Sequence, residues 1–441
     1  MRKVSLLALG AFTLGLDAYV MAGLLPVVAD DLDTTVSLAG QMVTAFTLAY
    51  ALSAPLVAGL LTGARPKSVI LVALAVFTLG NGLTAVAPSL ALLLASRVVA
   101  GAGAGVYAAL STAAASALVP TEQRGKALAL VMGGMSTGTV LGVPLGVLLA
   151  EHASWRATMG LVTALGAVAI GGLAALLPQV PAEPPVPARA RLGAIADPAV
   201  APVVGVSFLG AVASLGLYTY LAPVLEAAGD VDGVAPYLWA WGAGGVLGSL
   251  LIGPLVDRTG RVRALVAALL TAVGVAHLVL APVAGVPLLL GAALVVWGAG
   301  GWALQVPQQH QLLAVSARRG TVALALNNSA LYLGSAVGSA LGGLALAAGL
   351  PGDALPWAAA AILGLSLLLH LGAGRAAGAG ATRARGTDAA GAGPAGAGAP
   401  GAVGDAARAD GDGVACGAGG AGGVAGPARV VDGGASGTPQ A

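Results

Sequence analysis

Long apolar runs, separated by short segments of charged or turn-forming residues, make up most of the chain. Ten stretches carry almost no Asp, Glu, Lys or Arg, and each exceeds the roughly 20 apolar residues that a membrane-spanning helix needs. Two of them, 68–121 and 264–317, are long enough for two helices and contain a turn signal, Ala87-Pro88-Ser89 in one and Pro282 to Pro287 in the other. The others are 4–29, 34–64, 127–150, 157–182, 198–225, 233–256, 320–352 and 354–374. The pattern therefore predicts an all-α polytopic membrane protein with twelve transmembrane helices.

The composition excludes most soluble classes of protein. Of the 441 residues, 58% are hydrophobic and 9% are charged, whereas a soluble domain carries about 25% charged residues. We therefore expect neither an enzyme nor a nucleic-acid-binding protein. The single cysteine, Cys416, leaves no intramolecular disulfide and no multi-cysteine metal site. The sequence contains no glycine-rich loop of the kind that cradles ATP phosphates, so ATP-driven transport would need a partner.

The distribution of basic residues predicts the orientation in the membrane. If the N-terminus is cytoplasmic and the helices alternate, thirteen Lys and Arg residues before the C-terminal tail lie on the cytoplasmic side, and only Arg156 lies outside. Acidic residues mark the opposite side: Asp30, Asp31, Asp33, Glu226, Asp230 and Asp232. We therefore predict a multi-pass membrane protein with both termini in the cytoplasm.

The twelve helices divide into two related halves. Gly138, Gly142 and Gly146 recur 196 residues later as Gly334, Gly338 and Gly342, and Pro26 recurs 197 residues later as Pro223. The proline-rich stretch 179–198 predicts a cytoplasmic linker between six-helix bundles at 1–178 and 199–374. Residues 375–441 are mostly Gly and Ala, so we expect a disordered tail there. Repeated halves with a site at their interface are typical of alternating-access transporters.

Two charged residues lie well inside the predicted helices, Asp17 in the first and Arg97 in the fourth. A charge at mid-membrane costs about 2.5–3.5 kcal/mol or more, so each is a candidate for function. Counting along the helices places the two residues at similar depths, which would allow them to pair. The functional interpretation is a carboxyl group that exchanges a proton, tuned by Arg97. The alternatives are a structural ion pair or a carboxylate that faces water.

Two glycine-containing segments are candidates for conformational change. Residues 253–263 combine a glycine, an acid and a basic cluster at a membrane face, which favours a latch between transport states over an ordinary positive loop. Its residues are Gly253, Asp257, Arg258, Gly260 and Arg261. In the fifth helix, the glycines at 138, 142 and 146 allow close packing, and Pro144 adds a bend that favours a hinge.

A substrate cavity in a membrane needs aromatic and neutral polar side chains. The candidates within the predicted helices are Tyr19, Tyr50, Trp239, Trp302, Asn327, Asn328 and Tyr332. The adjacent amides of Asn327 and Asn328 are the most informative, because they are costly when they face lipid.

Several of these motifs resemble the major facilitator superfamily, and specifically its twelve-helix drug:proton antiporters. Residues 253–263 resemble the superfamily's loop signature, whereas the first-half copy, 59–67, has Thr62 where an acid is usual. Arg97-Val-Val-Ala-Gly101 resembles the family's arginine motif, with Ala100 in place of a common Gln. Residues 138–146 resemble the helix-five signature of exporters, and 15–26 resemble the first helix of chloramphenicol-type exporters of actinobacteria.

The resemblance covers about residues 4–374 and implies proton-coupled export of small amphipathic or antibiotic-like molecules by alternating access across the bacterial inner membrane. The proton would be the coupling ion, with no other cofactor or metal. The expected partners are a small-molecule substrate and membrane lipid, and the protein would work as a monomer. A sugar, nucleoside or metabolite carrier of the same fold is the alternative, followed by a transporter-like membrane sensor. The retained Asp17 and Arg97 and the 253–263 loop speak against a sensor.

Overall fold

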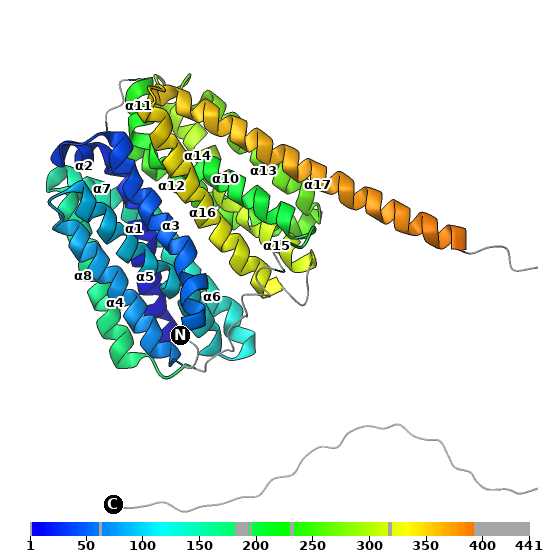
Figure 1. Ribbon diagram of the computed structural model, residues 1–441, viewed down its shortest axis with the longest axis horizontal. Helices are drawn as coiled ribbons and strands as arrows, with labels where there is room; N and C mark the ends of the chain where they lie inside the picture. The colour runs from blue at the N-terminus through cyan, green and yellow to red at the C-terminus, as the bar shows by residue number, and fades with distance from the viewer. Residues whose placement is uncertain are drawn as a thin grey trace, which may run out of the picture. The chain divides into compact units, whose positions relative to one another are not determined.

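The computed structural model describes residues 2–60, 64–180, 193, 196–229, 233–315 and 320–391. Within these residues twelve helices are long and apolar enough to cross a membrane, as the sequence predicts. The first half comprises α1 (Arg2–Gly23), α2 (Leu25–Asp31), α3 (Val36–Leu60), α4 (Pro66–Ala85), α5 (Leu90–Ala117), α6 (Arg124–Thr137), η2 (Gly138–Gly142), α7 (Val143–His152) and α8 (Trp155–Leu176). The second half comprises α10 (Ala201–Thr219), α11 (Leu221–Ala228), α12 (Ala235–Thr259), α13 (Val262–Leu280), α14 (Pro287–Ala303), α15 (Gln305–Val315), α16 (Gly320–Ala347) and α17 (Leu355–Gly391) (Figure 1).

The two predicted turns divide the long apolar stretches as expected. Helix α4 ends at Ala85, and α5 begins at Leu90 after Ser89, whose hydroxyl accepts a hydrogen bond from the Leu92 N–H. Helix α13 ends at Leu280, and α14 begins at Pro287. Proline suits the first turn of a helix because an N–H there has no partner within the helix.

Three of the predicted single helices are broken. Helix α1 stops at Gly23 and α2 begins at Leu25, and the same break recurs at Tyr220 and at Leu304. A proline follows each break within three residues, namely Pro26, Pro223 and Pro307. The proline ring collides with the carbonyl group four residues earlier and cannot donate a backbone hydrogen bond, so each helix is interrupted just before it.

The two halves repeat the same packing of their first and fifth transmembrane helices. A Cβ atom at Gly138 would collide with the carbonyl of Phe12, and one at Gly334 would collide with the carbonyl of Phe208. Both members of the second pair lie 196 residues after their counterparts. Glycine is therefore needed at these positions because two backbones approach directly.

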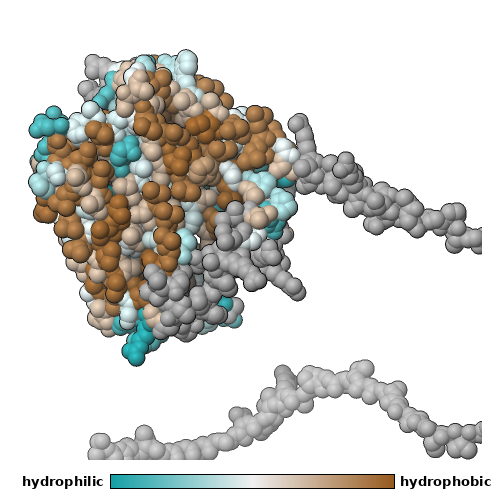
Figure 2. All heavy atoms as spheres, viewed as in Figure 1, coloured by the Kyte–Doolittle hydropathy of each residue, from teal (hydrophilic) through white to brown (hydrophobic). Residues whose placement is uncertain are grey.

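The surface shown in Figure 2 carries apolar side chains over most of its length, with polar side chains concentrated near the helix ends. We call the end with Arg65, Lys67, Arg124, Lys126 and Arg258 the basic side, and the end with Asp31, Glu151, Glu226 and Asp353 the acidic side. Exposed Leu and Val side chains on the transmembrane helices suit contact with lipid tails.

Helices α3 and α16 hold the halves together toward the acidic side. The Ser37 hydroxyl donates to the Gly343 carbonyl at 2.5 Å, and the Ser339 hydroxyl donates to the Gly40 carbonyl at 3.2 Å. In Figure 1 the ribbons of the two halves diverge toward the end where the N-terminus lies, which is the basic side. The halves therefore meet on the acidic side in this structure.

Helix α17 extends into the predicted tail and continues to Gly391, seventeen residues beyond residue 374. The segment 375–391 contains no proline and is rich in alanine, which has the highest helix propensity. Residues 392–441, residues 181–192 and 194–195 of the predicted linker, and Thr62 lie outside the described residues.

Candidate functional site

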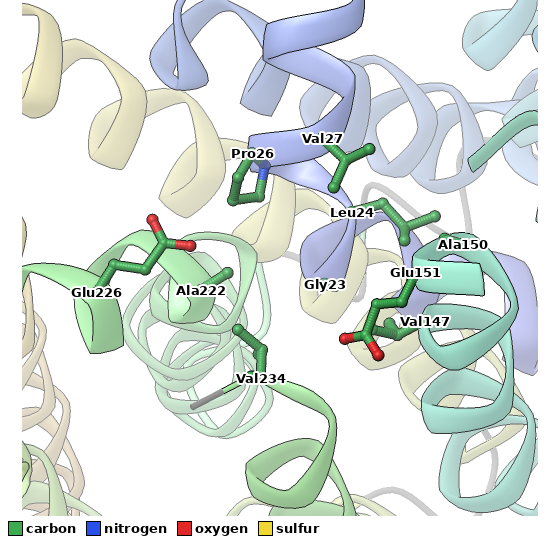
Figure 3. Close-up of a pocket in the computed structure, with 11 residues that line it drawn as sticks. Gly23, Leu24, Pro26, Val27, Val147, Ala150, Glu151, Ala222, Glu226 and Val234 are labelled. Carbon is green, nitrogen blue, oxygen red and sulfur yellow. The ribbon is translucent and has the colours of Figure 1, made fainter. Parts of the chain in front are cut away.

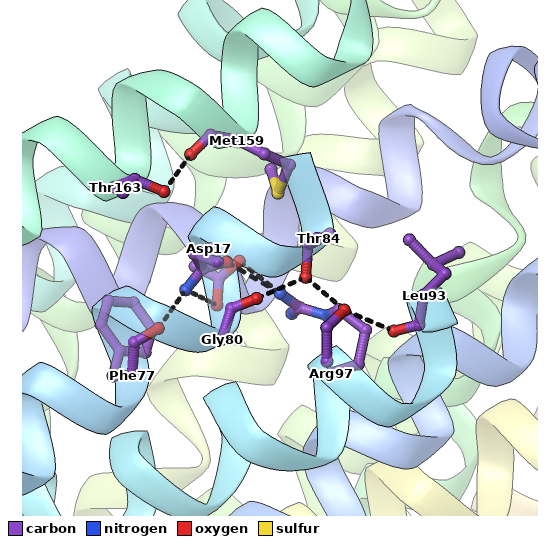
Figure 4. A network of polar contacts seen from close by, with 10 residues as sticks. Asp17, Phe77, Gly80, Thr84, Leu93, Arg97, Met159 and Thr163 are labelled. Atoms are coloured by element: carbon purple, nitrogen blue, oxygen red, sulfur yellow. Dashed lines mark hydrogen bonds and ion pairs between the residues drawn. The ribbon is translucent and has the colours of Figure 1, made fainter. Parts of the chain in front are cut away.

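Asp17 and Arg97 meet in the interior of the first half, as their similar predicted depths allow. The Arg97 Nη1 donates to Asp17 Oδ1 at 2.8 Å, and the side chains are 1% exposed for Arg97 and 0% for Asp17 (Figure 4). Asn81 of α4 completes the group: its Oδ1 accepts from Arg97 at 3.0 Å, and its Nδ2 donates to Asp17 Oδ2 at 3.3 Å. We call these three residues the polar centre. Both carboxylate oxygens of Asp17 are thus hydrogen-bonded.

Further contacts hold the polar centre in place. The guanidinium group of Arg97 lies 4.3 Å from the centroid of the Phe46 ring, which is a cation–π contact. Asn81 also donates to the Phe77 carbonyl at 3.1 Å, so its amide has a fixed orientation. A buried ion pair is stable only when such additional bonds satisfy the remaining groups, and losing one partner costs about 3–5 kcal/mol.

The polar centre connects three helices through one carboxylate. Asp17 lies on α1, Asn81 on α4 and Arg97 on α5, and both carboxylate oxygens of Asp17 accept bonds from the other two helices. Small shifts among these helices would therefore change which bonds form.

Asn81 was not predicted from the sequence. A single asparagine in an apolar helix forms no periodic pattern, and its importance follows only from its contacts with Asp17 and Arg97. The sequence does offer one indication, because an amide buried in an apolar helix is costly without hydrogen-bonding partners.

The second half carries an uncharged group in the topologically equivalent place. Ser214, His277 and Trp297 come from α10, α13 and α14, the seventh, ninth and tenth transmembrane helices. The indole N–H of Trp297 donates to the Ser214 hydroxyl at 2.6 Å, and the indole lies edge-on to the His277 ring at 4.7 Å. This trio contains no carboxylate–guanidinium pair, so the two halves differ in charge.

Aromatic rings from both halves meet between the bundles. Tyr50 of α3 stacks on Tyr332 of α16, with centroids 3.6 Å apart. Tyr19 of α1 lies 5.7 to 6.2 Å from three rings of the second half. We call the six residues of these contacts the aromatic seam: Tyr19, Tyr50, Tyr218, Trp241, Trp302 and Tyr332. It joins the halves through side chains rather than backbone.

The predicted cavity residues fall into two groups. Tyr19, Tyr50, Trp302 and Tyr332 belong to the aromatic seam, and Asn328 is exposed beside it, where its side chain interacts with the Tyr50 hydroxyl. The remaining two candidates, Trp239 and Asn327, lie elsewhere. Trp239 is half-buried and makes no ring contact within the described part of the chain, and Asn327 is buried with its Oδ1 unpartnered there.

Trp241 takes the place that we expected for Trp239. The two positions point in nearly opposite directions on a helix, so only the rotation of α12 decides which of them faces the first half. Tyr218 was also not predicted, because a tyrosine near a helix end is as typical of the membrane interface as of a cavity.

The predicted hinge in the fifth transmembrane helix contains a π-helical segment. Gly138–Gly142 forms η2 between α6 and α7, directly before Pro144. Pro144 cannot donate to the Val140 carbonyl and would collide with it, and a wider turn relieves that contact. Val140 itself lies against Gly242 of α12 in the second half. The irregular turn therefore sits where the halves touch.

The predicted latch loop is exposed on the basic side. Helix α12 ends at Thr259, and Gly260 closes it with φ +59°, a left-handed conformation that glycine adopts without strain. Asp257, Arg258 and Arg261 are exposed. Asp257 forms no ion pair with any residue that the structure describes. The loop is thus formed, and within the described ranges its acid has no basic partner.

A pocket of about 180 Å³ lies between the halves on the acidic side. Glu151 of α7 and Glu226 of α11 line it together with apolar residues of α1 and α2 (Figure 3). Burial raises the pKa of Glu226 above its ordinary value. This pocket was not predicted, because its walls come from segments that are distant in sequence.

Asp31 anchors a second charged cluster near this pocket. It accepts hydrogen bonds from Arg156 and, at 3.1 Å, from the indole N–H of Trp155. Arg156 also donates to the Ala87 carbonyl at 3.0 Å. The hydrogen bond from Arg156 is the main reason why the pKa of Asp31 lies below its ordinary value.

We expect Asp31→Asn to destabilise the protein slightly at pH 7 and progressively less below about pH 4. The pKa of Asp31 is lower in the folded protein, so its stabilisation is present above the unfolded-state pKa of about 3.9 and is lost as the pH falls through the folded-state pKa. Both side chains are one-third exposed or more, which limits the effect to about 1 kcal/mol. Thermal unfolding at pH 7 and pH 3 measures it, with the exposed Asp30→Asn as control. Equal effects of both variants would contradict the assignment.

Comparison with known proteins agrees with this architecture. The family model described as Major Facilitator Superfamily matches residues 7–339. The inner membrane transport protein YdhP of Escherichia coli K12 is 31% identical over 82% of this chain and 93% of its own length. A chloramphenicol resistance protein of Streptomyces lividans is 32% identical over 76% of this chain and 86% of its own.

A solved structure shows the same fold. The crystal structure of a D-xylose-proton symporter has a TM-score of 0.68 at 16% identity, and the match covers 84% of this chain and 96% of the symporter. The twelve helices in two repeated halves, the matched family model and these relatives lead to one conclusion. The chain belongs to the Major Facilitator Superfamily and is a secondary carrier of the membrane rather than an enzyme.

Proposed function

We propose that this carrier exports small, uncharged or amphipathic molecules in exchange for protons. The observation that carries the proposal is the polar centre, because Asp17 is a buried carboxyl whose two oxygens are held by side chains from two other helices. The name of the Streptomyces relative, a chloramphenicol resistance protein, supports export of an antibiotic-like compound. No cofactor is needed beyond the proton.

The proposed cycle uses the contacts between the halves. The halves meet on the acidic side here, so substrate enters from the basic side and reaches the aromatic seam. Proton binding at Asp17 and substrate release then accompany the opposite state, in which the basic side closes and Asp257 gains a partner. The protein works as a monomer in lipid, since each half supplies one wall of the path.

Direction of transport and coupling can be tested together. The gene is expressed in a pump-deficient bacterium, and a susceptibility panel that includes chloramphenicol identifies a compound to which it confers resistance. In everted vesicles the labelled compound should accumulate inside when respiration acidifies the lumen, and a protonophore should prevent this. Accumulation in right-side-out cells instead would support an importer of sugars, nucleosides or other metabolites.

We expect both termini in the cytoplasm. The basic residues gather on one side, and they are retained there by the translocation machinery. Reporter fusions after Arg191 and after Arg375 should both give a cytoplasmic signal, and a fusion after Glu226 should give a periplasmic one. A periplasmic signal at Arg375 would reverse the assignment of the basic side to the cytoplasm.

A further inference from the structure

The aromatic seam holds a polar atom that has no partner in this structure. The indole N–H of Trp241 makes no hydrogen bond with the described residues, and the side chain is 3% exposed. Leaving a buried donor unpaired is costly, because the group has lost its hydrogen bonds to water. An acceptor atom on a molecule bound among these rings would remove that cost.

Two of the rings around Trp241 are partly exposed. Tyr19 and Trp302 lie 6.0 and 6.3 Å from the Trp241 ring, and both are half-buried. Asn328 is exposed beside the stacked pair Tyr50 and Tyr332. The Tyr19 and Trp302 rings are themselves in contact, with centroids 6.2 Å apart, so a flat molecule that reaches the Trp241 N–H has to separate them. It then meets aromatic rings, an amide and the Trp241 N–H.

The charges nearby exclude ions from this face. Asp17 and Arg97 neutralise each other at 2.8 Å, and the guanidinium group is also covered by Phe46. The side chains of the seam are uncharged, so an ion would leave water without a counter-charge. Cation–π contacts with the rings offset part of this loss for a cation and none of it for an anion, so we expect the anion to bind most weakly.

We propose that the aromatic seam binds an uncharged, planar aromatic molecule that carries a hydrogen-bond acceptor, with Trp241 as the residue that selects the acceptor. The proposal rests on the proposed function, because it names the substrate class of the same transport path. Trp241 acts through its N–H, and Tyr50 and Tyr332 act through their ring faces.

Equilibrium dialysis of the purified full-length protein in detergent tests this with four probes of one shape. The two uncharged probes are 2-acetylnaphthalene, which carries an acceptor, and 2-ethylnaphthalene, which lacks one. The two charged probes are the anion 2-naphthoate and the cation 2-naphthylmethylammonium. After subtraction of uptake by empty micelles, we expect saturable binding of one 2-acetylnaphthalene per chain. We expect 2-ethylnaphthalene to bind more weakly and both ions at least about tenfold more weakly.

Three variants separate the N–H from the ring. Trp241→Phe should weaken 2-acetylnaphthalene binding by about 2- to 13-fold, which corresponds to one hydrogen bond of 0.5–1.5 kcal/mol, and leave 2-ethylnaphthalene unchanged. Trp239→Phe, two positions away and outside the seam, should change neither. Tyr50→Leu should weaken both probes. Thermal unfolding of each variant verifies that it is folded.

Three results would overturn the proposal: absence of saturable binding, ions that bind as tightly as 2-acetylnaphthalene, or equal effects of Trp241→Phe and Trp239→Phe. Because the assay measures binding without transport, it is independent of proton coupling. If the protein binds 2-acetylnaphthalene but shows no proton-driven accumulation in vesicles, the binding site stands and the exporter function is rejected. If it shows proton-driven accumulation in vesicles but does not bind 2-acetylnaphthalene, the exporter function stands and this binding site is rejected.

Discussion

Asp17→Asn should abolish proton-driven export and leave downhill movement of the same compound measurable. The amide keeps the size of the carboxyl group and its contact with Asn81 but cannot carry a proton through the cycle. Drug-induced release of protons from everted vesicles measures the effect directly. We expect a decrease to the level of vesicles without the protein, because Asp17 is the one acidic residue in the interior of the described transmembrane helices.

This variant leaves Arg97 without a counter-charge, which costs about 3–5 kcal/mol and can prevent folding. The double variant Asp17→Asn, Arg97→Gln therefore accompanies it, because it removes both charges and retains hydrogen-bonding groups. We expect the double variant to fold, to bind substrate and to lack proton release. Exchange of protons for substrate at the wild-type rate in either variant would show that Asp17 is not the coupling carboxyl.

Asp257→Asn should reduce transport by about tenfold or more while leaving the amount of protein in the membrane and its thermal unfolding unchanged. Asp257 is exposed and unpaired among the described residues, so its loss costs nothing in the state seen here. The charge is needed in the other state, where the basic side closes and the acid finds a partner. Initial rates of uptake into everted vesicles, normalised to protein, measure the change.

Thr62→Ala is the control, since Thr62 is a polar residue of the first-half loop, three residues after Gly59, whereas Asp257 lies four residues after Gly253. We expect it to change transport by less than about twofold. Similar losses in both variants would argue that the loops act alike and that the asymmetry inferred from the sequence is wrong.

The sequence alone determined the twelve helices, the two turns that divide the long stretches, and the similar depths of Asp17 and Arg97, which allow the ion pair that the structure contains. These follow from properties that are local along the chain. Burying a backbone in lipid requires a helix wherever about 20 apolar residues occur together, and a charge inside such a helix needs a partner at the same depth. The repeat of 196 residues likewise appears in three dimensions as the paired contacts of Gly138 and Gly334.

Only the tertiary structure decided which side chains meet. Asn81 joins the polar centre because α4 and α5 pack beside α1, and Trp241 rather than Trp239 enters the aromatic seam because of the rotation of α12. Asn327 and Asn328 are adjacent in sequence but about 100° apart around α16, so one is buried and the other is exposed. The rotation of a helix is set by the neighbours on which it packs, and in a chain that is apolar on nearly every face the hydrophobic pattern does not specify it.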